Sequence, residues 1–175
     1  MQLSTAQLQT LKTWVVNNAN SVFDQSTVNT LNAVASPDYW MWRTAVEKKE
    51  IVEAVSQDGT SFTWAGNGFI SRTAGELECW AQLFNSTLRC NPSLTNVRQA
   101  FADVFSGVGN AAANRTHLLA VARRKATVVE KLLAVVATGP GNDGGTRGTT
   151  TNPDAFGAGA EGPVTLQNLI DAANS

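Results

Sequence analysis

The sequence predicts an all-α protein: a small bundle of five to six helices with an extended, glycine-rich C-terminal arm. Three observations support this fold class. Apolar residues recur at the helical period in most segments before residue 137, and capping signals precede two of these segments. Only one short stretch alternates as a strand does. Eight of the fourteen glycines lie in residues 137–163, where no packed helix is expected.

The first helix is predicted to begin at Ser4. Ser4-x-x-Gln7 is a capping box, in which each side chain accepts a hydrogen bond from the other residue's backbone N–H. A second, shorter helix is expected at residues 26–35, and Pro37 ends it. The apolar stripe of the first helix consists of Leu8, Leu11, Trp14 and Val15.

Three aromatic residues then follow closely, Tyr39, Trp40 and Trp42, which are typical of a core or of an anchor between subunits. Residues 47–55, EKKEIVEAV, return to the helical period. Residues 60–70, TSFTWAGNGFI, are the strand-like exception, but their glycines interrupt the alternation. A short strand or an extended loop is therefore expected there, and a sheet-based fold is not.

The helical signal is stronger in the second half. Thr73-x-x-Glu76 forms another capping box and begins a helix. Residues 91–107, NPSLTNVRQAFADVFSG, carry an apolar stripe at the helical period, and Gly107 stands where a helix-ending glycine is common. A last, long helix is expected from Asn114 to about Val136.

The chain is accordingly divided into a helical body, residues 1–136, a flexible Gly/Thr/Asn-rich linker, residues 137–163, and a short amphipathic segment, residues 164–175. Two alternatives remain open for the arm: it binds a neighbouring copy, or it folds back on its own body. With the arm extended, removal of residues 138–175 should leave the body folded. The expected partner-binding residues are Val164, Leu166, Leu169 and Ile170.

Charge is unevenly distributed although the net charge is only −1. Residues 89–131 hold seven basic residues against two acidic ones, and residues 24–78 hold eight acidic residues against four basic ones. Such asymmetry favours contact with charged partners or with copies of the chain, while a solvated face is the simpler alternative. The residues expected at a charged protein interface or in contact with nucleic-acid phosphates are Arg115, Arg123, Arg124 and Lys125.

Little in the sequence indicates catalysis. His117 is the only histidine and stands beside Leu118, which is typical of a satisfied core histidine or a surface one. Cys79 and Cys90 are spaced unlike a metal site and are expected to be free thiols. No phosphate-binding glycine motif is present. We therefore expect no enzyme activity, no cofactor and no metal, and a soluble protein made in a cytoplasm without contact with a membrane.

Five blocks of the sequence resemble a family of structural proteins of tailed bacteriophages. They cover most of the chain in order, and NPSLTNVRQAFADVFSG followed by the pattern RRKAT-x-x-EKL is the most specific part. The glycine/threonine stretch here is longer than is usual for that family. The blocks are TAQLQTLKTWV, NTLNAVASPDYWMWRTAV, NPSLTNVRQAFADVFSG, RTHLLAVARRKATVVEKLLA and AEGPVTLQNLIDAAN.

The resemblance implies a head-to-tail joining (adaptor) protein in the neck of the virion. Such a role implies a ring of identical copies, with the portal protein and a tail or stopper protein as partners and passing contact with genomic DNA. Two alternatives remain: another virion component, such as a tail-completion or capsid-associated protein, and a DNA-binding regulatory protein that uses the basic residues.

Overall fold

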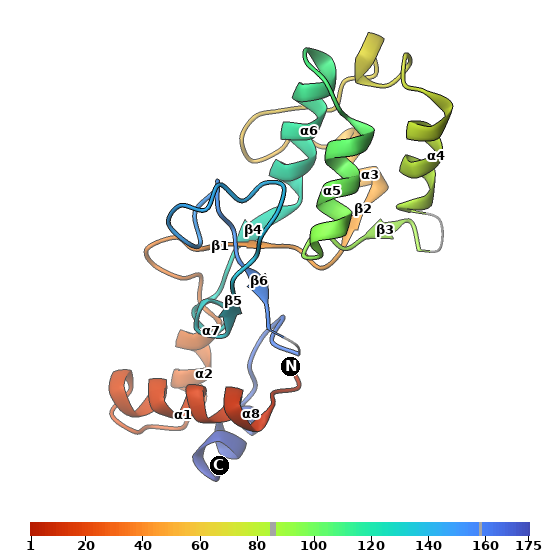
Figure 1. The fold of residues 1–175 in the computed structure, drawn as a ribbon. Helices are drawn as coiled ribbons and strands as arrows, with labels where there is room; N and C mark the ends of the chain where they lie inside the picture. The colour runs from red at the N-terminus through yellow and green to blue at the C-terminus, as the bar shows by residue number, and fades with distance from the viewer. Residues whose placement is uncertain (85–86, 158) are drawn as a thin grey trace.

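The structure, a computed structural model, describes residues 1–84, 87–157 and 159–175. Figure 1 shows an elongated molecule with two lobes joined by a narrower waist. The terminal lobe contains α1 (Thr5–Asn18), α2 (Gln25–Asn32), α7 (Val128–Leu132) and α8 (Leu166–Ala173). The distal lobe contains β2 (Val46–Glu47), α3 (Lys48–Glu53), η1 (Gly66–Gly68), α4 (Ala74–Gln82), β3 (Arg89–Cys90), α5 (Thr95–Val104) and α6 (Asn110–Val121). The waist contains β1 (Trp40–Trp42), β4 (Arg123–Lys125), β5 (Ala134–Val135), β6 (Ala155–Phe156) and residues 137–154.

This architecture contradicts the predicted all-α bundle of five to six helices. In the described part of the chain, eight short α-helices accompany three two-stranded sheets, with 44% of residues in helices and 11% in strands. The helices do not surround one core but enclose two separate apolar clusters. The prediction failed because strands of two or three residues form only where distant segments meet, and a local apolar pattern cannot show that.

The terminal lobe is built from both ends of the chain. α1 begins at the predicted capping box, with the Gln7 N–H donating to Ser4 Oγ and the Ser4 N–H donating to Gln7 Oε1 at 3.3 and 2.8 Å. Lys12 Nζ in α1 donates to the Ser175 carbonyl oxygen at 2.8 Å. The buried core of this lobe is Leu11, Val15, Val28, Leu31, Val129, Leu133, Ala160, Val164, Leu169 and Ala172.

The distal lobe has an aromatic core. Phe62 lies at its centre, with ring centroids 6.0 Å from Trp80 in a stacked arrangement and 5.8 Å from Phe105 edge to face. The capping box predicted at Thr73 begins α4. Residues 60–70 run as an extended loop that contains η1, with one isolated bridge between Ser61 and Val55. No helix in the described residues has both the length and the apolar character that crossing a bilayer requires.

The waist interrupts the long helix that was predicted from Asn114 to Val136. α6 ends at Val121, and residues 123–125 form β4, which pairs antiparallel with β1. Thr127 then caps α7 in a capping box with Glu130, so the backbone at Thr127 is extended. A helix cannot run through an extended N-cap residue, and the predicted helix is therefore divided in two.

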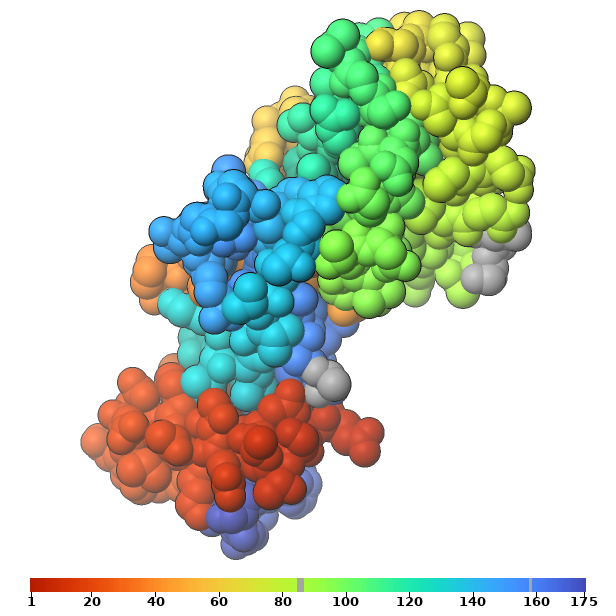
Figure 2. Space-filling model, viewed as in Figure 1, coloured from red at the N-terminus to blue at the C-terminus, as the bar shows by residue number. Residues whose placement is uncertain are grey.

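Residues 137–163, expected as an extended, flexible arm, fold back along the waist between the lobes (Figure 2, blue). The Trp40 N–H donates to Gly148 O at 2.8 Å, and the Trp42 N–H donates to Asp154 O at 2.8 Å. β6 pairs with β5. Of the two alternatives open from the sequence, the structure has the arm on its own body, because buried polar partners there satisfy its backbone groups.

Close approach to aromatic rings explains two glycines of this stretch. Gly148 has a φ of +70°, and a Cβ there would overlap the Tyr39 ring. Gly141 has a φ of +84°, and a Cβ there would lie 2.6 Å from Trp42 Cη2. Positive φ and absence of a side chain are both properties that glycine supplies without strain. The glycine content therefore allows this segment to pack rather than keeping it flexible.

Replacing Gly148 with alanine should lower the free energy of unfolding by about 3 kcal/mol. About 1 kcal/mol comes from placing a Cβ at positive φ and the rest from forcing the Tyr39 ring aside. Gly144 is the matched control, because its φ is +76° but no atom lies within 4 Å of its Cβ position. Urea unfolding should show a loss of about 1 kcal/mol for Gly144→Ala. Equal losses for the two variants would contradict the proposed overlap with Tyr39.

Candidate functional site

Three buried charged side chains lie where the lobes meet the waist. The first is Arg98, in α5 of the distal lobe. Its side chain is fully buried, and its guanidinium carbon lies 4.6 Å from the centre of the Trp42 ring. Burial lowers the pKa of Arg98 to about 10, so the group is still a cation at neutral pH. Arg98 thus ties the glycine-rich segment to the start of α5. The carbonyl oxygens that accept its hydrogen bonds belong to Pro92, Ser93, Thr138 and Pro140.

The second buried charge is Asp154, which is 1% exposed. Its carboxylate accepts hydrogen bonds from the Tyr39 hydroxyl and from Arg147, whose Nη2 lies 2.7 Å from Oδ2. The Asp154 N–H also donates to Trp40 O at 3.0 Å, so this residue continues the pairing of β1 on its open edge. Asp154 therefore fixes the end of the glycine-rich segment to the waist.

Tyr39 reports directly on this arrangement because it is the only tyrosine. Burial raises the pKa of Tyr39 to about 12, and the hydrogen bond to Asp154 acts in the same direction. The unfolded value is about 10, so this contribution to stability is complete below pH ~10 and is lost as the pH rises towards ~12. An absorbance titration should show ionisation near pH 12 in the folded protein and near 10 in urea. Ionisation of the folded protein near 10 would contradict the buried contact.

The third buried charge is Glu130 in α7. Both Arg124 Nη atoms donate to its carboxylate, at 2.9 and 2.7 Å, and the N–H groups of Thr127 and Gly162 donate at 2.9 and 3.0 Å. Burial alone would raise the pKa of Glu130, but these hydrogen bonds outweigh it and hold the pKa below its usual range. Glu130 therefore joins β4, α7 and the returning C-terminal segment.

The predicted basic residues are not a free cationic face. Arg123, Arg124 and Lys125 lie together in β4, whereas Arg115 lies apart in α6. The three residues of β4 each form an ion pair within the chain, which leaves little uncompensated charge for a phosphate backbone. The partners are Phe105 O for Arg115, Asp58 and Thr150 O for Arg123, Glu130 and Glu161 for Arg124, and Asp38 for Lys125.

The four apolar residues expected to bind a partner have two different positions. Val164 and Leu169 are 2% and 0% exposed and belong to the core of the terminal lobe. Leu166 and Ile170 are 38% and 42% exposed on the outer face of α8. Only this second pair is available for contact with another molecule.

His117 is a satisfied core histidine, as one of the two interpretations of the sequence had it. The ring is fully buried, with Nε2 2.7 Å from Ile51 O and Nδ1 3.1 Å from Thr60 Oγ1. Because a carbonyl oxygen only accepts, Nε2 carries the proton and Nδ1 accepts from Thr60. The described residues contain no group of three or more His, Cys, Asp or Glu side chains arranged to hold a metal ion.

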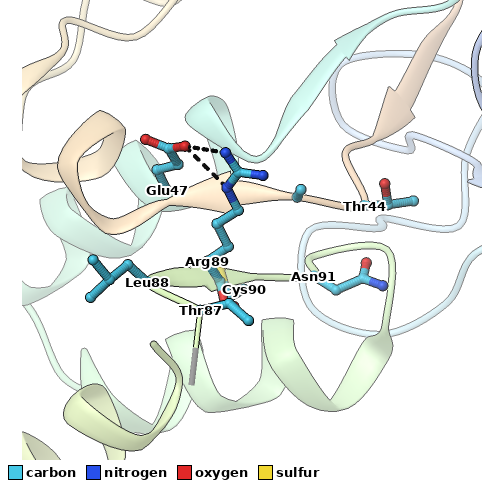
Figure 3. Close-up of a pocket in the computed structure, with 8 residues that line it drawn as sticks. Thr44, Glu47, Thr87, Leu88, Arg89, Cys90 and Asn91 are labelled. Carbon is cyan, nitrogen blue, oxygen red and sulfur yellow. Dashed lines mark hydrogen bonds and ion pairs between the residues drawn. The ribbon is translucent and has the colours of Figure 1, made fainter. Parts of the chain in front are cut away.

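An open pocket runs along the β2–β3 pair (Figure 3). The pocket contains an ion pair in which Arg89 Nη2 lies 2.6 Å from Glu47 Oε1. Both side chains are exposed to solvent, and ion pairs of this kind contribute little to the stability of the fold. The Cys90 thiol of this pocket is buried, which raises its pKa to about 12. A thiol that stays protonated at neutral pH is a poor nucleophile, so this pocket lacks an activated sulfur.

The far end of the distal lobe exposes apolar side chains. Trp64, Ile70 and Val108 are 47%, 74% and 81% exposed. The Ile70 N–H donates to Trp64 O at 3.2 Å within one loop, and Asn67 Nδ2 donates to Val108 O at 2.7 Å, which ties that loop to the one containing Val108. We call residues 59–71 and 104–114 the distal tip. They contain no charged side chain.

The opposite end of the molecule is also poor in charge. Residues 1–37 and 162–175 carry charged side chains only at Lys12, Asp24 and Asp171. An open pocket lies along α1 beside Leu132 of α7, and we call it the α1 groove. Every side chain that lines it is uncharged: Ala6, Gln9, Thr10, Thr13, Trp14, Asn17, Asn18 and Leu132.

Comparison of the chain with protein families, with curated proteins and with solved structures gave no match.

Sequence reasoning missed the three buried charges, and two of them had a local signal. Arg98 stands four residues after Leu94 and three before Phe101, on the apolar stripe of its helix. Glu130 completes a capping pattern that begins at Thr127. Asp154 had no comparable signal, because Arg147 binds it from an irregular loop and its other side-chain partner, Tyr39, is 115 residues away.

Proposed function

We propose that this protein is a non-enzymatic structural subunit of a tailed-bacteriophage particle, a head-to-tail adaptor that forms a ring of identical copies between portal and tail. The place in the particle comes from the five sequence blocks that resemble that family. The extended arm no longer supports the role, because residues 137–163 lie on the chain's own body. Contact with a portal must then come from the surface of the folded molecule.

The observation that best supports a structural role is what the three buried charged side chains bind. Arg98, Glu130 and Asp154 all bind groups of this same chain at the join between the lobes. A catalytic charge would instead face a site that a substrate can enter. Here the buried charges hold the two lobes in a fixed relative position. Such rigidity suits a subunit of a particle, because the relative position of its two contact surfaces must not vary.

The alternative of a DNA-binding regulator has weaker support. Arg123, Arg124 and Lys125 would have to leave acidic partners before they neutralised phosphates. A gel-shift titration at low salt tests it, and salt-dependent binding of duplex DNA would favour it over the structural role.

Mass spectrometry of purified virions, combined with a particle reconstruction, tests the main proposal. We expect a fixed, ring-like copy number and density adjoining the portal. Density elsewhere in the particle would replace the adaptor with another virion component. Absence of the chain from infectious particles would overturn the proposal.

A further inference from the structure

The two ends of the long molecule share a surface chemistry that its middle lacks. Neither the distal tip nor the α1 groove contains a charged side chain, although charged residues make up 15% of the chain. Surfaces designed to remain in water are given about 25–35% charged residues. Depletion of charge together with exposed aromatic and aliphatic side chains is the composition of an interface core.

The distal tip presents exposed apolar side chains on two loops that hydrogen bonds hold together. Trp64, Ile70 and Val108 belong to its two loops and are about half to four-fifths exposed. Asn110 Nδ2 donates to Ala65 O at 3.0 Å, which is a second hydrogen bond between the loops beside that from Asn67 to Val108 O. A segment fixed in this way loses little conformational entropy on binding.

The α1 groove has the complementary features. Trp14 and Leu132 are half-buried and provide an apolar floor. The exposed side chains of Gln9, Thr13 and Asn17 form an uncharged rim that can donate and accept hydrogen bonds. The apolar side chains of the distal tip can enter such a groove without removing an ion from water. Removing an ion from water is energetically costly.

We propose that the distal tip of one copy docks in the α1 groove of the next copy. This inference rests on the ring of identical copies in the proposed function and names the surfaces that form it. A second copy is the occupant because it presents an uncharged surface at either end, whereas pairing either end with the charged waist would desolvate ions. The contact joins two different surfaces, and such heterologous contacts generate closed rings when the rotation between copies closes.

The test uses the purified full-length chain and two blocking variants. Ile70→Asp places a carboxylate on the tip, and Thr13→Asp places one on the rim of the groove. Each residue is exposed, so the folded state should survive, which circular dichroism checks. Leu88→Asp is the matched control, because Leu88 is 68% exposed but lies beside Glu47 and Arg89 in the β2–β3 pocket, outside both proposed surfaces.

Light scattering across a concentration series should show that the wild-type chain and the Leu88→Asp control increase in mass. Each blocking variant should associate at least ~30-fold more weakly, as expected when a central contact is lost. A mixture of the two variants should form a one-to-one dimer and stop there, because each variant keeps one intact half of the contact. If either blocking variant misfolds, Val108→Asp on the tip and Asn17→Asp on the groove replace them.

A wild-type chain that stays monomeric at all concentrations would overturn the inference. So would a Thr13→Asp variant that assembles normally, since tip-to-tip contact would then be indicated. Equal loss of assembly by the control would show a general effect of added charge and would also overturn it. These outcomes are separate from the virion measurement: a monomeric chain found in particles refutes only the contact, and a self-assembling chain absent from particles refutes only the adaptor.

Discussion

Replacing Arg98 with methionine should lower the free energy of unfolding by about 3–5 kcal/mol, because several buried carbonyl oxygens lose their donor at once. Methionine keeps much of the volume but donates no hydrogen bond, so the four backbone carbonyls that Arg98 binds lose their partner inside the protein. Unsatisfied buried acceptors each cost about 1–3 kcal/mol unless the segment moves out to water. Since typical domains are stable by only about 5–15 kcal/mol, a large share of the stability depends on this one side chain.

Urea unfolding measures the loss, and hydrogen exchange locates it. We expect residues 138–142 to lose protection first in the Arg98→Met protein, because their carbonyls are released. Arg89→Met is the matched control: the Arg89 side chain is 58% exposed in its ion pair with Glu47, and its loss should change stability by less than about 1 kcal/mol. Similar losses in both variants would contradict the role given to Arg98.

Deleting residues 164–175 should unfold the terminal lobe and leave the distal lobe intact. The deleted segment supplies Val164, Leu169 and Ala172 to the core that covers α1 and α2, and no residue of that core belongs to the distal cluster. This reverses the expectation from sequence that the helical body folds without the arm. Hydrogen exchange should show α1 and α2 unprotected while α5 and α6 keep slow exchange.

A point variant distinguishes the loss of core packing from the effect of shortening the chain. Leu169 is fully buried, so Leu169→Ala should lower the free energy of unfolding by about 2–5 kcal/mol. Ile170, its neighbour on the same helix, is 42% exposed, and Ile170→Ala should cost less than about 1 kcal/mol. If α1 kept its protection after the deletion, the C-terminal segment would not be part of this core, and an arm free to bind a neighbour would again be the better interpretation.

Local signals in the sequence identified the elements that are stabilised locally. The capping boxes at Ser4 and Thr73 begin α1 and α4 as predicted, because such a box depends on residues only three positions apart. Residues 26–35 and 91–107 likewise contain helices close to the expected ones, α2 and α5. These helices have apolar stripes that any partner surface would bury.

Elements fixed by distant contacts escaped prediction. β4 exists because residues 123–125 pair with β1 some eighty residues earlier, where the Arg123 guanidinium and the Lys125 ammonium each lie 5.9 Å from the Trp40 ring. The glycine-rich segment is ordered by Arg98 and Tyr39, which lie far from it in sequence. Glycine content alone indicates a large entropy of ordering, and it says nothing about whether buried partners offset that entropy.

In the candidate site, too, local sequence patterns were visible but the contacts made by distant residues were not. The basic run at residues 123–125 was visible in the sequence, but its neutralisation by Asp58, Glu130 and Asp38 was not. The arm residues were chosen for their amphipathic pattern, which marks an apolar face without saying what covers it. In the structure α1 covers half of that face, and Ile170 stays exposed.

The terminal lobe has its first and last elements in contact, with Lys12 bonded to Ser175 and Asn168 Nδ2 bonded to Met1 O at 3.3 Å. A ribosome therefore releases α1 long before α8, the helix that covers it, has been synthesised. The distal lobe, which is built from one continuous stretch, can fold on the nascent chain, whereas the terminal lobe closes only after α8 has been synthesised. Until then Leu11 and Val15 lack their cover, so a chain cut short in synthesis exposes the apolar surface that chaperones and proteases recognise.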